Sequence, residues 1–365
     1  MREWDAIVVG AGIIGCGIAR ELARRGARTA IFDSRGPGSG ATKASAGVLA
    51  PYIEAPDAGA LHDLTVRSLA LYDDFIAELE EDTGTRVEYS RCGSLEIADG
   101  AASVERLTAL GKSLRAAGID AHWLDDAEAM RLEPALSRRA GGLLVPSHGY
   151  VRAAQLTATL LDAATRRGAE LLAGHAVEPL ASTADEGAGG VVYAGGEIHR
   201  AATVVIAAGS WSGHVAPTTP SIAPVRGQLL ELCWNGPPIT RVLWSESCYV
   251  VPWIDKTVLV GATVEDVGFD ERTTVNGVRT LMEAVRRLLP AADAATFVGA
   301  RAGLRPSSAD GLPVIGRSRV HPAVVYATGH YRNGVLLAPL TARLVGDLVI
   351  DGRADPVLGL TAPSR

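Results

Sequence analysis

Residues 5–15 read Asp5-Ala6-Ile7-Val8-Val9-Gly10-Ala11-Gly12-Ile13-Ile14-Gly15, an apolar strand that runs directly into a G-x-G-x-x-G turn. Gly10 permits the tight turn, Gly12 lets the backbone approach a pyrophosphate, and Gly15 lets the following helix pack closely on the sheet. The amides and the positive dipole end of that helix then bind the pyrophosphate. The stretch therefore predicts a dinucleotide-binding βαβ unit, with an ordinary glycine-rich turn as the alternative.

The residues that follow complete this unit. Ile18, Leu22 and Ala23 share one face of the helix, and residues 29–32 form a short buried strand that ends at Asp33. A carboxylate at this position accepts hydrogen bonds from both hydroxyls of an adenosine ribose and disfavours a 2′-phosphate. The pattern leaves NAD or FAD as the cofactor.

The loop after Asp33 indicates which of the two cofactors is bound. Residues 36–47 are almost all small, at a place where an NAD-binding domain would normally begin its next helix. Such a loop lets extended backbone run beside a long cofactor and donate amides and hydroxyls to it. We therefore expect FAD, and a flexible surface loop is the alternative interpretation of these residues.

Length and charge limit the class of protein. The chain has 365 residues and a net charge of −6, with a pI near 5.8. The length suggests two domains, and the acidic balance argues against nucleic acid and favours a small-molecule substrate. A fold that begins near residue 5 leaves no room for a signal peptide, and the apolar run 6–19 is too short to span a bilayer. We expect a cytoplasmic protein with no membrane partner, and the sequence leaves open whether it forms a homo-oligomer.

Cysteines are few and scattered. Cys16, Cys92, Cys233 and Cys248 lack CxxC spacing and matching histidines. We therefore predict neither a metal site nor a disulfide framework, and we expect buried structural thiols.

The order of elements predicts an α/β fold in which a Rossmann-like FAD-binding domain is built from discontinuous segments. Residues 202–209 and 324–329 have the pattern of buried parallel strands, whereas residues 225–300 alternate as in an antiparallel sheet that is open on one face. We assign residues 1–85, 141–220 and 301–365 to the FAD-binding domain, and residues 86–140 and 221–300 to a substrate-binding domain with an antiparallel sheet.

Four further motifs accompany the N-terminal turn. They are SAGVLAP at residues 45–51, IAAGSWS at 206–212, AGLRP at 302–306 and GHYRNGVLLAP at 329–339. Together they resemble the glycine oxidases of thiazole biosynthesis, within the D-amino-acid oxidase superfamily of FAD-dependent amine oxidases. The resemblance covers essentially the whole chain, and the last two motifs are its most specific part.

The resemblance implies a set of cofactor contacts beyond the three glycines of the turn. These contacts are Ile13, Ile14, Asp33, Ser34, Thr42, Ala46, Gly47, Val48, Val177, His330, Tyr331, Arg332, Asn333, Gly334, Val335 and Leu336. Val177 would offer backbone to the adenine, and residues 330–336 would wrap the flavin. Family members with covalently bound flavin attach it to a cysteine in the C-terminal half. No cysteine follows Cys248 here, so we expect non-covalent FAD.

The same resemblance places Tyr249, Arg305 and Arg332 around the substrate, with Arg305 pairing its carboxylate. The residues themselves agree for Arg305, because a planar guanidinium in a stiff Leu-Arg-Pro segment can bind a carboxylate through two parallel hydrogen bonds. An internal salt bridge is the alternative for Arg305, and an ordinary core position is an equal alternative for Tyr249. For His330 we favour scaffolding beneath the flavin over acid–base chemistry.

The activity implied by the resemblance is oxidation of glycine or of a small N-substituted glycine, a primary or secondary amine. The substrate Cα donates hydride to flavin N5, the imine hydrolyses to a 2-oxo acid such as glyoxylate, and O2 is reduced to H2O2. The partners are thus a small-molecule amine or amino acid and O2. We nominate no general base.

Three positions depart from the family pattern. Val48 and Val264 stand where glycine oxidases often carry methionine, and Ser247 stands where they often carry histidine. Shorter side chains could make room for a bulkier N-carboxymethyl amino acid of secondary-metabolite (β-amino acid) biosynthesis, whereas neutral drift with repacking is the other interpretation. An FAD-dependent amino-acid dehydrogenase that uses an acceptor other than oxygen is the second alternative function.

Overall fold

A seven-stranded sheet carries the N-terminal βαβ unit. The computed structural model describes residues 2–178, 190–216 and 221–365, and in it this sheet has the order β17-β18-β11-β1-β2-β9, with β10 paired to β11. Its strands are β1 (Arg2–Val9), β2 (Thr29–Asp33), β9 (Glu170–Ala173), β10 (Gly190–Ala194), β11 (Glu197–Ile206), β17 (Val314–Arg317) and β18 (Val324–Thr328). Strands β18, β11, β1, β2 and β9 are parallel, which confirms a Rossmann-like sheet assembled from distant segments.

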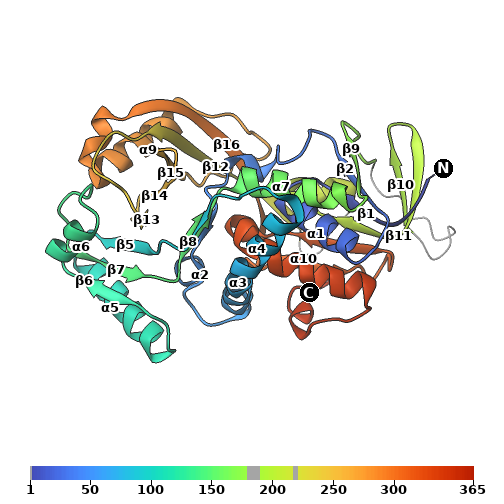
Figure 1. Ribbon diagram of the computed structural model, residues 1–365, viewed down its shortest axis with the longest axis horizontal. Coiled ribbons are helices and arrows are strands. Elements are labelled where there is room, and N and C mark those ends of the chain that lie inside the picture. The colour runs from blue at the N-terminus through green and yellow to red at the C-terminus, as the bar shows by residue number, and fades with distance from the viewer. Residues whose placement is uncertain (1, 179–189, 217–220) are drawn as a thin grey trace.

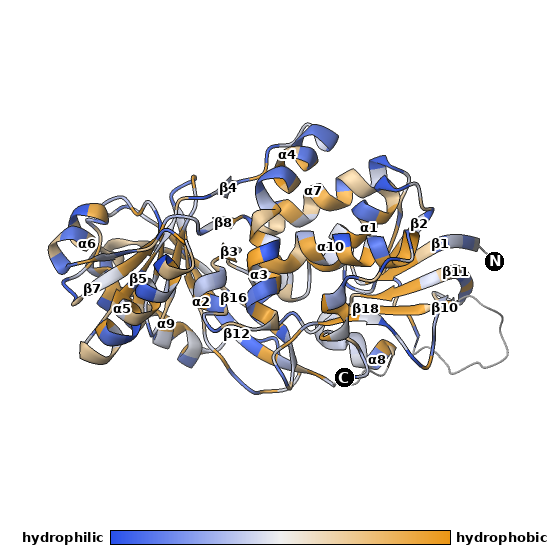
Figure 2. Ribbon diagram, turned by 90° about the horizontal axis from the view of Figure 1, so that it is seen from below, coloured by the Kyte–Doolittle hydropathy of each residue, from blue (hydrophilic) through white to orange (hydrophobic). Residues whose placement is uncertain are grey.

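Helices α1 (Ile13–Arg24) and α10 (Gly334–Ile350) contact this sheet, and further helices pack on them, so that all share one large hydrophobic cluster with the sheet. The further helices are α3 (Ala60–Ala70), α4 (Tyr72–Thr83) and α7 (Ala153–Arg166). Figure 2 shows hydrophobic residues concentrated in α1, α10 and the strands beside them. The window Tyr331–Ile350 is apolar and long enough to cross a membrane, but 72% of it is buried inside the protein, so α10 is a core helix.

An eight-stranded, mostly antiparallel sheet forms the other half of the molecule, at the left in Figure 1. Its order is β16-β12-β15-β14-β13-β5-β7-β6. The strands are β5 (Ser94–Ala98), β6 (His122–Leu124), β7 (Gly141–Val145), β12 (Ile222–Cys233), β13 (Val242–Trp244), β14 (Tyr249–Pro252), β15 (Thr257–Gly261) and β16 (Thr296–Ser308). This sheet confirms the antiparallel sheet predicted from residues 225–300.

Three helices accompany the second sheet: α5 (Ala101–Ala116), α6 (Asp126–Leu132) and α9 (Val275–Leu288). The alternation predicted across residues 225–300 is wrong for α9. Leu281, Val285 and Leu288 are buried there and recur at helical spacing, which places one apolar face of α9 on the sheet.

The predicted domain boundaries fall near two strand pairings of this sheet. β7 pairs with β5 and β16 pairs with β12, so residues 141–145 and 301–308 lie in the eight-stranded sheet and not with the FAD-binding strands. The predicted boundaries differ from these pairings because β7 and β16 pair with strands that are distant in sequence. Such pairing is not visible in the sequence pattern of either strand alone. The division into domains stays a prediction, and its boundary at residue 220 lies outside the described residues.

Short elements join the two sheets. They are a three-stranded sheet of β3 (Val48–Leu49), β8 (Gly149–Val151) and β4 (Tyr89–Ser90), the helices α2 (Pro51–Glu54) and α8 (Ser212–Val215), and the 3-10 helices η1 (Ala41–Ala44), η2 (Gly209–Trp211) and η4 (Tyr331–Asn333). Two other 3-10 helices lie apart from this junction: η3 (Pro290–Ala294) between α9 and β16, and η5 (Pro356–Gly359) after α10. The long strands β12 and β16 run from the second sheet toward the first, and β16 contacts η1, η2 and η4 (Figure 1). The carboxyl ends of the parallel strands therefore meet the end of β16, which is where ligands bind in open α/β sheets.

Candidate active site

A large pocket lies at this junction and collects most of the residues predicted from the sequence. The predicted residues that line it are Gly10, Gly12, Ile13, Ile14, Asp33, Ser34, Thr42, Ala46, Gly47, Val48, Val177, Tyr249, Arg305, His330, Tyr331, Arg332, Gly334 and Val335. Gly15, Asn333 and Leu336 are not part of its lining, and the latter two are buried behind it. The sequence thus identified one connected cavity, although the role of each residue in it stays a prediction.

The glycines of the N-terminal turn have the separate structural roles that the motif predicts. A Cβ on Gly10 would lie 2.4 Å from the Ala207 carbonyl oxygen, and one on Gly15 would lie 1.8 Å from the Gly10 carbonyl oxygen. A Cβ on Gly12 would meet nothing closer than Thr42 Oγ1 at 3.5 Å. Gly10 and Gly15 therefore permit close packing, while Gly12 presents open backbone to the pocket.

The start of α1 suits a negatively charged group. Its first turn has no acidic side chain, and Gly12 at the N-cap has no side chain to satisfy the free amides. Ile13 N donates a hydrogen bond to Thr42 Oγ1 at 3.2 Å, which ties the small-residue loop to this helix end. Unsatisfied amides and the helix dipole together fit a pyrophosphate, as FAD would place there.

Asp33 is held rigidly at the end of β2. Its Oδ2 accepts a hydrogen bond from Ala11 N at 2.8 Å, and its Oδ1 accepts from Arg35 N and Gly36 N at 2.9 and 2.8 Å. Each carboxylate oxygen has more than one acceptor site, so the group can still accept bonds from a ribose. A fixed acid in the pocket wall fits the adenosine half of FAD.

Part of the connection between β15 and α9 contacts the nucleotide end of the pocket. We call residues 269–271 the rim segment. The Phe269 ring lies 5.6 Å from Trp211 and 4.9 Å from His214, and Glu271 pairs with Arg35 at 2.5 Å. Trp211, His214 and Arg35 all line the pocket, so the rim segment packs against the outer side of its wall. Sequence analysis missed these contacts because their members come from distant segments, with Arg35 and Glu271 separated by 236 residues.

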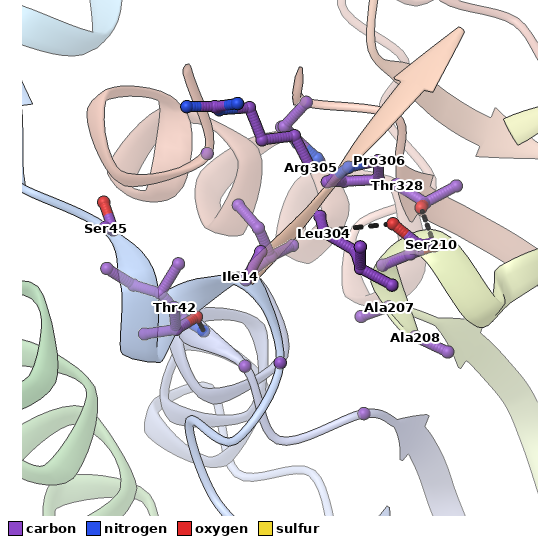
Figure 3. A pocket seen from close by; sticks show the side chains of 18 of the residues that line it. Ile14, Thr42, Ser45, Ala207, Ala208, Ser210, Leu304, Arg305, Pro306 and Thr328 are labelled. Carbon is purple, nitrogen blue, oxygen red and sulfur yellow. Dashed lines mark hydrogen bonds between the residues drawn. The ribbon is translucent and has the colours of Figure 1, made fainter. Parts of the chain in front are cut away.

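Arg305 on β16 is fixed by backbone groups of the neighbouring strands. Its Nη1 donates hydrogen bonds to Thr263 O at 3.0 Å and to Arg226 O at 3.3 Å. A Cβ on Gly227 would lie 2.2 Å from Nη2, so the guanidinium rests on bare backbone. Figure 3 shows the side chain extending from the Leu304–Pro306 segment of the pocket wall. A guanidinium has five N–H donors, and Nη1 carries only two, so enough remain for a carboxylate.

Tyr249 lies beside this arginine. Like Arg305 on Gly227, it lies in a notch, a place where a glycine leaves the backbone bare. It is paired with Gly261 across β14 and β15, and a Cβ on Gly261 would lie 2.3 Å from its hydroxyl. On its other side the Trp244 ring lies 5.0 Å away. Burial raises the pKa of Tyr249 and the Arg305 charge opposes this, with the net effect upward. The phenol therefore stays protonated and can donate a hydrogen bond to a carboxylate.

Glu54 is a pocket residue that sequence analysis missed. It ends α2, directly after the SAGVLAP motif, and its side chain is only 9% exposed. Its Oε2 lies 2.9 Å from Arg332 Nη2. Burial raises the pKa of Glu54, and the charges of Arg332 and Arg305 act against this rise. In the sequence, the one sign of this role was that Glu54 is an acidic residue at the end of a short apolar segment.

His330 is placed as a scaffold. Its Nε2 forms a hydrogen bond with Thr341 Oγ1 at 3.1 Å, and the residue is buried. Burial lowers the pKa of His330 to about 3, so the imidazole is neutral near pH 7. These properties support the expectation that His330 scaffolds the site and does not act in acid–base chemistry.

The pocket-size argument from three shortened side chains is wrong for two of them. Val48 lines the pocket, but Ser247 is exposed and Val264 has 61% of its surface exposed, and neither lines the pocket. Val264 follows Thr263, whose carbonyl holds Arg305, and its side chain lies outside the cavity. Only Val48 can therefore enlarge the pocket directly.

The sequence matches one protein family over most of its length. The family described as FAD dependent oxidoreductase (DAO) matches residues 5–348. The glycine oxidase of Geobacillus kaustophilus is 35% identical over 354 residues, which cover 95% of this chain and 93% of that protein. The bifunctional protein ThiO/ThiG of Nostoc sp. is 36% identical over 97% of this chain, which spans only 54% of that relative.

Solved structures give the same picture. The crystal structure of G. kaustophilus glycine oxidase superposes with a TM-score of 0.95 at 33% identity, covering 100% of this chain and 99% of that one. Iminodiacetate oxidase (IdaA) from Chelativorans sp. BNC1 superposes with a TM-score of 0.87 at 28% identity, covering 98% of both chains. The whole chain is therefore similar to FAD-dependent amine oxidases in sequence and in structure.

The notch under Arg305 gives a first prediction. Gly227→Ala should displace the guanidinium and raise the KM for the substrate about tenfold to a hundredfold, because charge-assisted hydrogen bonds contribute about 1.5–3 kcal/mol each. Arg305→Lys should have a similar effect, because lysine keeps the charge but loses the planar fork. Steady-state kinetics measure both variants. The control is Gly299→Ala, where a Cβ on β16 meets open space, and a KM for Gly227→Ala equal to the control would contradict the prediction.

The rim segment gives a second prediction. Glu271→Gln should raise the Kd for FAD about two- to fivefold, because a surface ion pair contributes about 0.2–1 kcal/mol. Titration of the apoprotein with FAD, followed by flavin fluorescence, measures this Kd. Glu283→Gln, which removes an exposed ion pair with Arg279 on α9, should leave the Kd unchanged. Equal Kd values for the two variants would show that the rim segment does not retain FAD.

Proposed function

Because the chain belongs to the FAD-dependent oxidoreductase family and is homologous to glycine oxidases, we propose that it oxidises glycine or a small N-substituted glycine at the expense of O2. The reaction converts R–NH–CH2–COO−, O2 and water into R–NH2, glyoxylate and H2O2. The observation that carries this proposal is the pair of Arg305 and Tyr249, both set in glycine notches of the same pocket wall.

The proposed roles of these two side chains follow from their geometry. Arg305 binds the substrate carboxylate with the donors that the Thr263 and Arg226 carbonyls leave free. The Tyr249 hydroxyl donates a hydrogen bond to the same carboxylate. Two anchors on rigid strands fix the position of Cα, and positioning of this kind supplies much of the rate enhancement in such reactions.

Bound FAD would supply the redox chemistry, by accepting two electrons from the substrate and passing them to O2. The N-terminal glycine turn, Asp33 and Thr42 would hold its adenosine and pyrophosphate, and residues 330–335 would hold the flavin. We propose that the cofactor is non-covalent. In support, no cysteine is among the described residues that line the pocket.

Two finer assignments are also part of the proposal. Iminodiacetate oxidase, a structural relative, acts on an N-substituted glycine by its name, and Val48 leaves more room in the pocket than methionine would. Secondary amines are therefore proposed substrates beside glycine. We also propose a cytoplasmic location with free small molecules as partners, which the acidic net charge supports because it disfavours a nucleic-acid partner.

The proposal predicts peroxide release from a small panel of amines. The purified yellow protein should release H2O2 and glyoxylate with glycine, N-methylglycine and N-ethylglycine, and D-alanine should be a poorer substrate. Coupled peroxidase assays measure the rates, and acid precipitation should leave all FAD in the supernatant. Reduction of an artificial dye without peroxide would favour the dehydrogenase alternative, and flavin that stays on the precipitated chain would contradict non-covalent binding.

A further inference from the structure

The two arginines at the substrate end of the pocket have different partners. Arg305 donates hydrogen bonds to two backbone carbonyls and lies beside the neutral Tyr249 hydroxyl, whereas Arg332 is paired with the Glu54 carboxylate at 2.9 Å. Backbone carbonyls orient a guanidinium without cancelling its charge. A buried carboxylate cancels most of the charge that it faces. The Arg305 charge is therefore more available to an anion than the Arg332 charge, which directly faces Glu54.

The charge balance of this end of the pocket follows from the groups that line it. They are Glu54, Arg305, Arg332, Tyr249 and His330. Tyr249 and His330 are neutral near pH 7, since burial raises the pKa of the first and lowers that of the second. Although burial raises the pKa of Glu54, its contact with Arg332 at 2.9 Å favours the ionised form, so one acid and two arginines leave a single net positive charge. A substrate with one carboxylate matches this charge.

A second carboxylate on the substrate would meet an unfavourable environment. It would either approach the negative Glu54 or have to displace it from Arg332. Like charges repel strongly where little water screens them, and displacing Glu54, whose side chain is 9% exposed, would leave a buried carboxylate without its partner. Rejection through an unfavourable contact is a common source of specificity.

We propose that the Glu54–Arg332 ion pair restricts the enzyme to amines with one carboxylate, namely glycine and N-substituted glycines whose substituent is neutral or cationic. The inference rests on the proposed function and narrows it. It makes N-carboxymethyl amino acids, which carry two carboxylates, poor substrates despite the space beside Val48. Glu54 and Arg332 are then specificity-determining residues, distinct from the Arg305 anchor.

The test compares two substrates of nearly equal size that differ by one charge, iminodiacetate and its monoamide. For the FAD-loaded wild-type protein, kcat/KM should be at least tenfold higher for the monoamide. In Glu54→Gln this ratio should fall at least tenfold, because the repelling charge is removed and Arg332 is released. The ratio compares both substrates in one preparation, so partial loss of folding or of FAD does not alter it.

Two further variants test whether the effect comes from Glu54 itself. Arg332→Gln leaves Glu54 without a partner, so it should reject iminodiacetate more strongly and should improve kcat/KM for the cationic N-(2-aminoethyl)glycine relative to the monoamide. Glu246→Gln, which neutralises an exposed acid near the pocket strands, should keep the wild-type ratio. A change in Glu246→Gln as large as in Glu54→Gln would mean that general surface charge sets the preference and would overturn the proposal.

Binding provides a readout that does not depend on turnover. Malonate and its monoamide differ by the same single charge, and perturbation of the flavin absorbance reports their Kd values. The wild-type protein should bind the monoamide more tightly, and Glu54→Gln should remove most of that preference. Equal affinities in the wild-type protein, or an unchanged preference in Glu54→Gln, would overturn the inference. Failure to oxidise glycine, N-methylglycine and both iminodiacetate compounds would contradict the proposed function instead.

Discussion

The backbone at Gly10 approaches Ala207 so closely that no side chain fits between them, and the position of the whole site depends on this contact. It brings the carboxyl ends of β1 and β11 together. Gly15 then lets α1 begin directly above the turn, with its free amides facing the pocket. A β-carbon at either glycine would move the helix end away from the strands, and the phosphate site would be lost with it.

At the substrate end of the pocket, in the second sheet, glycines again permit close packing against the backbone. Gly227 on β12 and Gly261 on β15 leave two notches, in which the Arg305 guanidinium and the Tyr249 ring lie against bare backbone. Side chains held this way lose little freedom when a substrate binds, because packing has already restricted them. In the proposed reaction, strands β14 and β16 would therefore set the position of the substrate carboxylate.

Sequence reasoning succeeded where the evidence is local. The βαβ unit, Asp33 and the two C-terminal motifs are contiguous patterns, and each lines the pocket as expected. It failed where partners come from distant segments. Glu54 meets Arg332 across 278 residues, and the rim segment reaches Arg35 from the other half of the molecule, so no spacing rule could pair them. Val264 was placed near the pocket by the resemblance alone, and in the irregular connection after β15 its side chain is 61% exposed and points away from the cavity lining.

A crystal structure of the FAD-loaded protein with bound acetate would test most directly how the two arginines divide their roles. Acetate has the carboxylate of glycine but no amine, so it should occupy the anchor without reacting. The expected density shows its carboxylate against the Arg305 guanidinium and the Tyr249 hydroxyl, with the ion pair between Glu54 and Arg332 intact. Acetate bound to Arg332, with Glu54 displaced, would contradict this division and would make Arg332 the anchor of the substrate.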